Sequence, residues 1–188
     1  MKKKLPILVL VITGILMTGV IVYLFLLKDN KTETTELSSM NTGAIDNNNQ
    51  VDIYLYFANA DNNFLSAEKR NVLHPGDPSG FGKIIVQELI KGSHGKLQRT
   101  MPEQTSLRSF YLSGDGIAYV DFSQEIKEQQ PGGSHSEYLT IYSIVNSIVY
   151  NVADIKAVKI LINGNEATTL AGHIGIGSPI RADMVMVR

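Results

Sequence analysis

The sequence predicts an α+β domain in which two helices pack on a sheet. Three patterns between residues 51 and 164 support this prediction. After Ser134, apolar residues recur at spacings of three and four, which is typical of a helix with one buried stripe. Residues 51–57 place Ile and Leu side chains on every second position, as a strand does. Asn163-Gly164 between two apolar runs indicates a hairpin. The expected order of elements over residues 51–188 is ββαββαββ.

The N-terminus has the pattern of a membrane anchor. Lys2, Lys3 and Lys4 precede an uncharged run from Leu5 to Leu27, which as a helix would span roughly 34 Å. The run ends in large residues, Tyr23 to Leu27, and so offers no small-residue cleavage site. We therefore expect residues 1–30 to form a short cytoplasmic N-terminus and a single transmembrane helix, with the rest of the chain on the periplasmic or cell-wall side.

Residues 31–50 are rich in Thr, Ser and Asn, and we expect them to be a flexible linker with a reach of about 25 Å. From residue 31 onward the chain carries 13 Lys and Arg against 17 Asp and Glu, a net charge of −4. This mildly acidic balance argues against nucleic acid as a partner. The chain has no Cys, which excludes disulfides, thiolate metal sites, cysteine nucleophiles and a lipidated cysteine anchor.

The first half of the domain should hold two hairpins separated by a helix. Strands are expected at residues 51–57 and 64–72, and a helix should follow the break at Gly76-Asp77-Pro78 and end at Gly92. Its inward side chains should be Phe81, Ile84, Ile85 and Leu89. Residues 107–112 and 117–122 flank Ser113-Gly114-Asp115-Gly116 and should form the second hairpin. Asp115 and Asp121 are expected at solvated positions.

The second half is organised around the helix that begins at Ser134. Ser134 and Glu137 have the spacing of a capping box, in which both side chains bond backbone amides of the first turn. On that interpretation Glu137→Gln should be tolerated. Strands at residues 157–162 and 166–170 should follow, and then an irregular tail that is rich in glycine.

Two loops are candidate binding sites. Gly132, Gly133 and Ser134 precede a helix and could hold an anion, although simple capping is the alternative. His135 and Glu137 could bind a metal, but two residues apart on a helix their side chains diverge. His173, in a glycine-rich loop, could belong to a ligand site, or its glycines could simply let the tail turn.

No catalytic constellation is visible in the sequence. There is no G-x-S-x-G, no HExxH and no pair of carboxylates at a spacing suited to acid–base work. Residues 91–96, KGSHGK, lack the spacing of a phosphate loop and follow a helix rather than precede one, so a helix end and loop is the better interpretation. The sequence therefore suggests no cofactor and no metal.

The chain resembles the GerMN domain family of sporulation and germination proteins. The resemblance covers about residues 51–183 and rests on short segments taken together: IYLYF at 53–57, VQELIKG at 86–92, AYVDFS at 118–123, PGGS at 131–134 with Glu137, YSIVNS at 142–147, ILING at 160–164 and LAGH at 170–173. It implies a small α+β domain of the cell envelope, similar to ring-building motifs of secretion systems, with no known catalytic residues. We expect the chain to hold one such domain, and because it has no Cys we expect it to lack the lipid anchor often found in the family.

Two functions are compatible with these observations. The first is a non-catalytic, membrane-anchored assembly module that contacts other envelope proteins or a second copy of itself. The alternative is a ligand-binding domain for cell-wall glycan such as peptidoglycan, using the loop before the central helix and the His173 loop. An assembly module should show a sheet edge or an apolar patch, and a glycan binder should show exposed aromatic rings beside polar groups.

Overall fold

The structure, a computed structural model, describes residues 49–188. The predicted transmembrane helix and nearly all of the predicted linker lie outside these residues. No helix within residues 49–188 is both long and apolar enough to cross a membrane.

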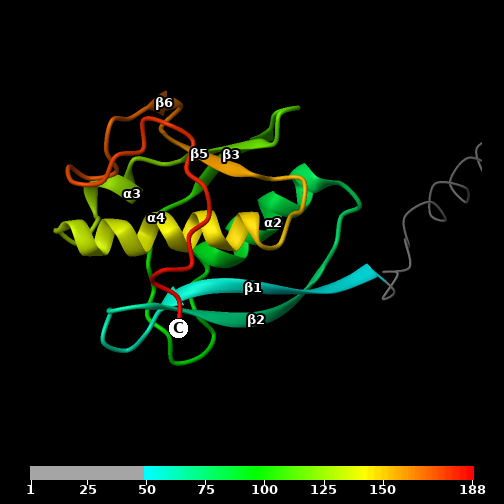
Figure 1. Ribbon diagram of the computed structural model, residues 1–188, viewed down its shortest axis with the longest axis horizontal. Coiled ribbons are helices and arrows are strands. Elements are labelled where there is room, and N and C mark those ends of the chain that lie inside the picture. Colours follow the sequence, from blue (N-terminus) through cyan, green and yellow to red (C-terminus); the bar gives the residue numbers. More distant parts are fainter. Residues whose placement is uncertain (1–48) are drawn as a thin grey trace, which may run out of the picture. The chain divides into compact units, whose positions relative to one another are not determined.

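The described residues form nine elements, labelled as in Figure 1. They are β1 (Gln50–Ala58), β2 (Leu65–Leu73), α2 (Pro78–Ile90), β3 (Leu107–Leu112), β4 (Ile117–Phe122), α3 (Glu125–Glu128), α4 (Ser134–Val149), β5 (Ala157–Ile162) and β6 (Asn165–Glu166). The predicted order is confirmed, with the one-turn helix α3 added before α4. β6 is shorter than predicted, because the chain after it turns inward to bury Leu170 and pairs Thr169 with Gly175.

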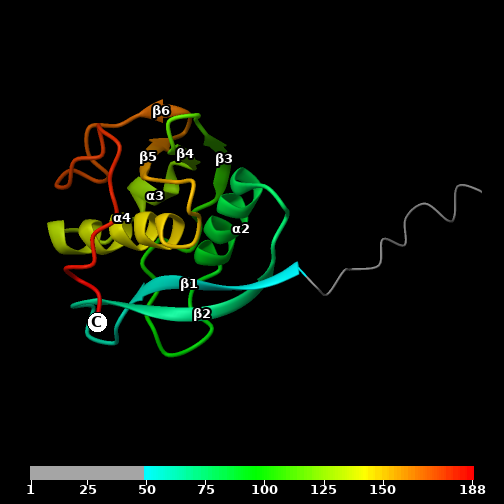
Figure 2. The ribbon, with the colours of Figure 1, turned by 45° about the vertical axis from the view of Figure 1, so that its right-hand side comes forward.

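The prediction of a single sheet is wrong. β1 and β2 form a separate antiparallel hairpin, and the other strands form a second sheet in the order β3-β4-β5-β6, with β4 and β5 parallel. Helix α4 runs between the hairpin and the larger sheet, with α2 beside it (Figures 1 and 2). The strands therefore cannot meet in one sheet, because α4 occupies the space between them.

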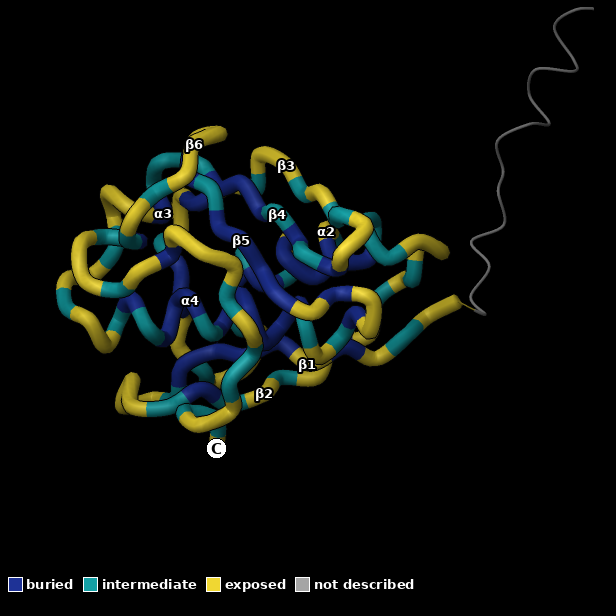
Figure 3. Tube along the Cα trace, turned by 45° about the horizontal axis from the view of Figure 1, so that its top comes forward, coloured by how far each residue is buried: buried dark blue, intermediate teal, exposed yellow. Residues whose placement is uncertain are grey.

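The core is built by the apolar faces that the sequence pattern predicts. Figure 3 shows buried backbone running through the middle of the domain. Large side chains with no exposed surface come from both sheets and both long helices: Ile53, Leu55, Phe57, Ile85, Ile141, Ile144, Ile148, Phe122 and Ile160. Phe81 and Leu89 of α2 are buried as predicted, whereas Ile84 is only half-buried.

The ends of α2 also follow the prediction. The Asp77 side chain accepts a hydrogen bond from the Gly80 N–H at 2.6 Å, and Pro78 occupies the first helical position. Gly92, with φ of 84°, follows the C-cap residue Lys91 and supplies the left-handed conformation that many helix ends need.

Asp121 differs from its prediction, because it is 5% exposed rather than solvated. One carboxylate oxygen accepts from the Gly164 N–H at 2.8 Å and the other from Arg108 Nε at 3.0 Å. Asp121 thus fixes the turn between β5 and β6 and joins it to β3. Burial is tolerated because both oxygens have donors.

A polar stripe on α4 makes hydrogen bonds to the backbone of β1, along the edge that faces away from β2. Ser143 Oγ donates to the Tyr56 carbonyl at 2.5 Å, and Ser147 Oγ accepts from the Tyr56 N–H at 3.0 Å. Just beyond the helix, Asn151 accepts from the Tyr54 N–H at 2.9 Å and donates to its carbonyl at 2.8 Å. These three residues lie four apart, so they share one face of the helix and replace the neighbouring strand that β1 lacks.

Because Ser147 belongs to this polar stripe, Ser147→Ala should destabilise the domain. The change leaves the Tyr56 N–H without its acceptor in a place that excludes water, so we expect the free energy of unfolding to fall by about 1–2 kcal/mol. Ser134→Ala, at the exposed start of the same helix, is the matched control and should have little effect. Equal midpoints for the two variants in thermal or denaturant unfolding would contradict the proposed role of the stripe.

Candidate functional site

The start of α4 does not form the predicted capping box. The residue that caps the helix is Gly133, with φ of 101°, and no side chain bonds the first-turn amides. Instead Ser136 Oγ turns back and donates to the Pro131 carbonyl at 2.5 Å. Gly132 and Gly133 therefore shape the turn into the helix, and Ser134 is exposed without a capping bond.

Glu137 faces the interior rather than the helix start, and its side chain is 1% exposed. Its carboxylate accepts hydrogen bonds from the backbone N–H groups of Ala171 at 3.1 Å, His173 at 3.2 Å and Ile174 at 2.9 Å. It also lies 2.7 Å from His173 Nδ1. The structure thus brings together two of the six candidate residues, Glu137 and His173, from segments more than thirty residues apart.

These contacts keep Glu137 ionised. Burial alone raises the pKa of a carboxyl group, but here the N–H donors and the His173 ring outweigh it, and the pKa of Glu137 lies below its usual value. A carboxylate whose two oxygens are filled by donors is a poor general base. We therefore assign Glu137 to holding the loop at residues 171–174 against α4.

The loop itself depends on Gly172, whose φ of 120° is costly for other residues. His173 extends outward from this loop, and its side chain is 53% exposed. The glycines let the tail turn, as predicted, and the buried carboxylate fixes that turn in place.

His135 and Glu137 diverge, as their spacing predicts. His135 Nε2 lies 2.7 Å from the carbonyl of Asn62, in the turn between β1 and β2. Within residues 49–188, no three His, Asp or Glu side chains converge on a point that could hold a metal ion.

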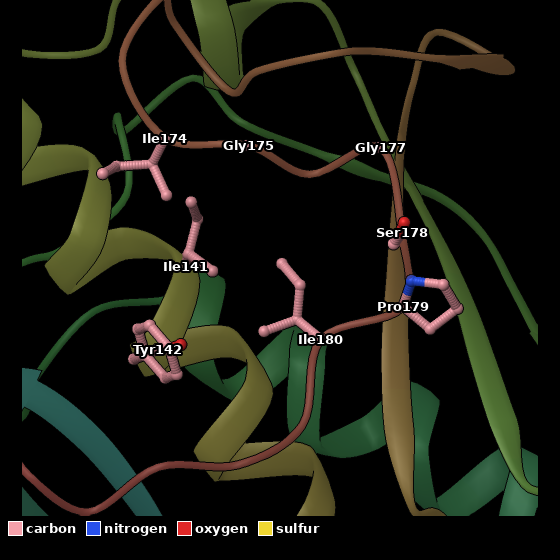
Figure 4. Close-up of a pocket in the computed structure, with 8 residues that line it drawn as sticks. All are labelled: Ile141, Tyr142, Ile174, Gly175, Gly177, Ser178, Pro179 and Ile180. Carbon is pink, nitrogen blue, oxygen red and sulfur yellow. The ribbon is translucent and has the colours of Figure 1, made fainter.

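Two hollows lie on the surface of α4, on either side of Ile174. The first has a volume of about 410 Å³ and is shown in Figure 4, where Ile141, Ile174 and Ile180 face one opening. Its other lining residues are Tyr142, Gly175, Gly177, Ser178 and Pro179. The second, about 380 Å³, is lined by Ser134, His135, Tyr138, Ile174, Val185 and Met186.

We call these two hollows together the α4 groove. Ile174 lines both of them, and the rings of Tyr138 and Tyr142, 4.3 Å apart, connect them along the helix. Val185 on its rim is 75% exposed. The residues that line the groove from the tail were missed in the sequence, where the tail shows only a short apolar end. Three of the predicted site residues, Ser134, His135 and Glu137, lie in the groove wall or support it.

The loop at residues 91–96 is a structural element, as predicted. Glu68 of β2 accepts from Ser93 Oγ at 2.5 Å and from the His94 N–H at 3.1 Å. Arg70, whose side chain is 5% exposed, bridges Glu68 at 2.7 Å and Glu88 at 3.1 Å. Although burial raises the pKa of Glu68, these donors bring it down to about 2. The loop is thus tied to the hairpin by charge that is largely buried, and the backbone N–H groups of His94 and Gly95 are occupied by Glu68 rather than free to bind phosphate.

The fold of this chain is similar to that of several solved structures. A protein from Clostridium perfringens classed as a lipoprotein is 27% identical, with a TM-score of 0.52 over 73% of this chain and 91% of that one. The first GerMN domain of the sporulation protein GerM from Bacillus subtilis is 19% identical, with a TM-score of 0.54 over 70% of this chain and 97% of that domain. The tandem GerMN domains of the same protein are 21% identical, with a TM-score of 0.51 over 71% of this chain and 45% of that one. Among curated proteins no sequence matches this chain.

The sequence itself matches the family described as Germane, sporulation and spore germination, over residues 54–168. That match runs from β1 to just beyond β6 and covers more than half of the chain. The matched segment contains most of the hairpin, both long helices and the strands of the larger sheet. The chain therefore belongs to the Germane family of sporulation and spore germination proteins.

Proposed function

We propose that this protein is a non-catalytic assembly module of the bacterial cell envelope, anchored in the cytoplasmic membrane by residues 1–30 and linked to sporulation or germination. Its partners would be other envelope or membrane-anchored proteins. The observation that carries the proposal is the α4 groove, an exposed apolar surface between the 174–180 segment and the C-terminal tail. An exposed apolar groove of this kind is typical of a surface that contacts another protein.

The role of Glu137 supports an interaction function. The carboxylate fixes residues 171–174, and Ile174 in that segment is shared by both halves of the groove. The buried Glu137 carboxylate and the half-exposed His173 ring thus hold the shape of a surface rather than activating a nucleophile. The family assignment and the envelope relatives are consistent with a domain outside the cytoplasm.

Cell-wall glycan is the alternative ligand, because the second hollow also places polar groups beside an aromatic ring. Tyr138 lies next to Ser134 and His135 there, and tyrosine beside hydroxyl and imidazole groups can recognise a sugar. The partially open form of this hollow would suit one sugar ring of a longer chain.

A charge placed on the rim should separate these alternatives. Val185→Glu in the full-length chain should abolish crosslinking to the envelope partner, because a carboxylate on an apolar rim must be desolvated on binding. The measurement is chemical crosslinking in native membranes followed by mass spectrometry. Tyr111→Glu, at a 63% exposed position on β3, is the matched control and should crosslink like the parent.

Neither variant should change the thermal midpoint by more than a few degrees, since both positions are exposed. If Val185→Glu crosslinked to the same proteins as the parent, the groove would not be the partner site. Retention of the parent chain on purified peptidoglycan, lost in a Tyr138→Ala variant, would favour the glycan ligand instead.

A further inference from the structure

In the part of the chain that the structure describes, the outer edge of β2 carries a row of backbone groups without hydrogen-bond partners. Tyr54 and Tyr56 of β1 direct their N–H and C=O groups away from β2, toward Asn151, Ser147 and Ser143. In an antiparallel pair, residues opposite one another point either both inward or both outward. Lys69 and Ala67, which lie opposite these tyrosines, therefore direct their own groups outward.

The same alternation places the outward backbone groups of Asn71 and Leu73 on this edge. Within residues 49–188, none of these four residues makes a backbone hydrogen bond on the outer side of β2. The opposite edge of the hairpin is closed by α4, so the two edges of the same hairpin differ sharply. All four residues are exposed.

One end of this edge already pairs with the C-terminal tail through a single parallel bridge. The Leu65 N–H donates to the Met186 carbonyl at 2.7 Å, and the Arg188 N–H donates to the Leu65 carbonyl at 2.9 Å. Val187 thus bridges Leu65 of β2, and the Arg188 carbonyl accepts a hydrogen bond from Ser66 Oγ at 2.9 Å. The edge therefore accepts backbone hydrogen bonds from a neighbouring segment at Leu65, and that position is already occupied.

We propose that the open edge of β2 pairs with β2 of a second copy of this chain, antiparallel and about a two-fold axis, to give a four-stranded sheet across the dimer. In this arrangement Ala67 lies opposite the partner's Leu73, and Lys69 lies opposite the partner's Asn71. The proposal concerns the edge rather than the α4 groove, and it rests on the proposed membrane anchoring only for the raised local concentration.

The register follows from the residues at each end. Centring the axis on Lys69 would set two lysines opposite each other and direct the partner strand against the tail at Leu65. Centring it on Asn71 would place Ala67 opposite Pro75, which has no N–H to donate. The register centred on Arg70 uses all four outward residues and leaves Leu65 to the tail. It sets Arg70 opposite its own copy, but that side chain is only 5% exposed, and its charge is compensated within the chain by Glu68 and Glu88.

The side chains are compatible with this register. A lysine on an edge strand normally discourages pairing, but Lys69 Nζ lies 2.7 Å from the Asp52 carboxylate of its own chain. Its neighbour across the interface would be a neutral asparagine. Leu73, 47% exposed in the single chain, would be covered by Ala67 of the other copy. Such a short pairing is weak alone, so two copies held in one membrane would favour it.

Cysteine crosslinking of the full-length, naturally cysteine-free chain tests the proposal. Ala67→Cys and Leu73→Cys, carried on two differently tagged copies in one membrane, should form a mixed disulfide on mild oxidation. Their Cα atoms would be about 5.5 Å apart, within disulfide range. Copies carrying the same single substitution should not crosslink, because identical positions would lie roughly 20 Å apart.

A proline variant provides the decisive control. Asn71→Pro removes an N–H that has no partner among residues 49–188, so it should abolish the mixed disulfide. Its thermal midpoint should stay near that of Asn71→Ala, and Asn71→Ala should still crosslink. Val185→Glu in the α4 groove should leave the mixed disulfide unchanged. The test of pairing at the β2 edge is therefore independent of the test of partner binding at the groove. Absence of the mixed disulfide, or equal crosslinking of the single variants with themselves, would overturn the pairing.

Discussion

Glu137→Ala is expected to lower the free energy of unfolding by about 3 kcal/mol, which corresponds to a fall of roughly 10 °C in the thermal midpoint. The substitution leaves the backbone N–H groups of Ala171, His173 and Ile174 without their common acceptor. Each unpaired buried donor costs about 1–3 kcal/mol, and water that enters the gap offsets part of the sum. Differential scanning calorimetry of the variant and its parent measures the change.

Glu137→Gln should also destabilise, by about 2 kcal/mol, because its amide nitrogen would face N–H donors where the carboxylate presents an acceptor. A capping box predicts the opposite order, with Ser134→Ala as the harmful change and Glu137→Gln as the mild one. Glu128→Gln in α3, at an exposed position, is the control for loss of charge. A mild Glu137→Gln together with a harmful Ser134→Ala would restore the capping interpretation.

The same carboxylate should contribute to acid unfolding. The pKa of Glu137 is lowered in the folded state, so its stabilisation is fully present above the unfolded pKa of about 4.3 and is lost as the pH falls through the folded value. Glu137→Gln removes this titration. The stability of the variant should therefore depend less steeply on pH below about 4.3 than that of the parent.

The error at Glu137 shows what a local pattern can and cannot predict. Ser134 and Glu137 have the spacing of a capping box. The N–H groups that donate to the Glu137 carboxylate, however, are 34 to 37 residues farther along the chain. No spacing rule within one helix can detect a loop that folds back over it. The glycine-rich composition around His173 indicated a turn, and only the fold shows that the turn packs on α4.

The elements themselves were predictable because their signals are local. The alternation in β1, the Gly-Asp-Gly and Asn-Gly turns, and the end of α2 at Gly92 all depend on neighbouring residues. The division into two sheets was not predictable, since Ser143, Ser147 and Asn151 read as ordinary polar positions on a helix. Their role appears only when β1 lies beside them. Asp121 was missed for the same reason, because its donors come from β3 and from the turn after β5.

Arg70→Met should be as harmful as the loss of Glu137, with an expected cost of about 3–5 kcal/mol. The substitution keeps an unbranched side chain of similar length but removes the cation between Glu68 and Glu88, whose side chains are only 15% and 16% exposed. It also removes a donor to the Gly92 carbonyl at the end of α2. Two carboxylates then share a partly buried site without a counter-charge, and the link between β2 and α2 is lost.

The pH dependence distinguishes this electrostatic effect from a loss of packing. The pKa of Glu68 is held at about 2 in the folded protein, so the stabilisation it provides is complete above about pH 4.5 and declines as the pH falls toward 2. Without Arg70 the pKa of Glu68 should rise, and the midpoint of acid unfolding should move to higher pH. At low pH, protonation of Glu68 relieves its repulsion with Glu88 in the variant. The free energy of unfolding of Arg70→Met should therefore fall below that of the parent by less at pH 3 than at pH 7. Lys69→Met, which removes an exposed cation from the adjacent position, is the matched control and should leave the stability unchanged. A deficit in Arg70→Met that is equal at both pH values would mean that Arg70 acts through its packing on Phe57 rather than through its charge.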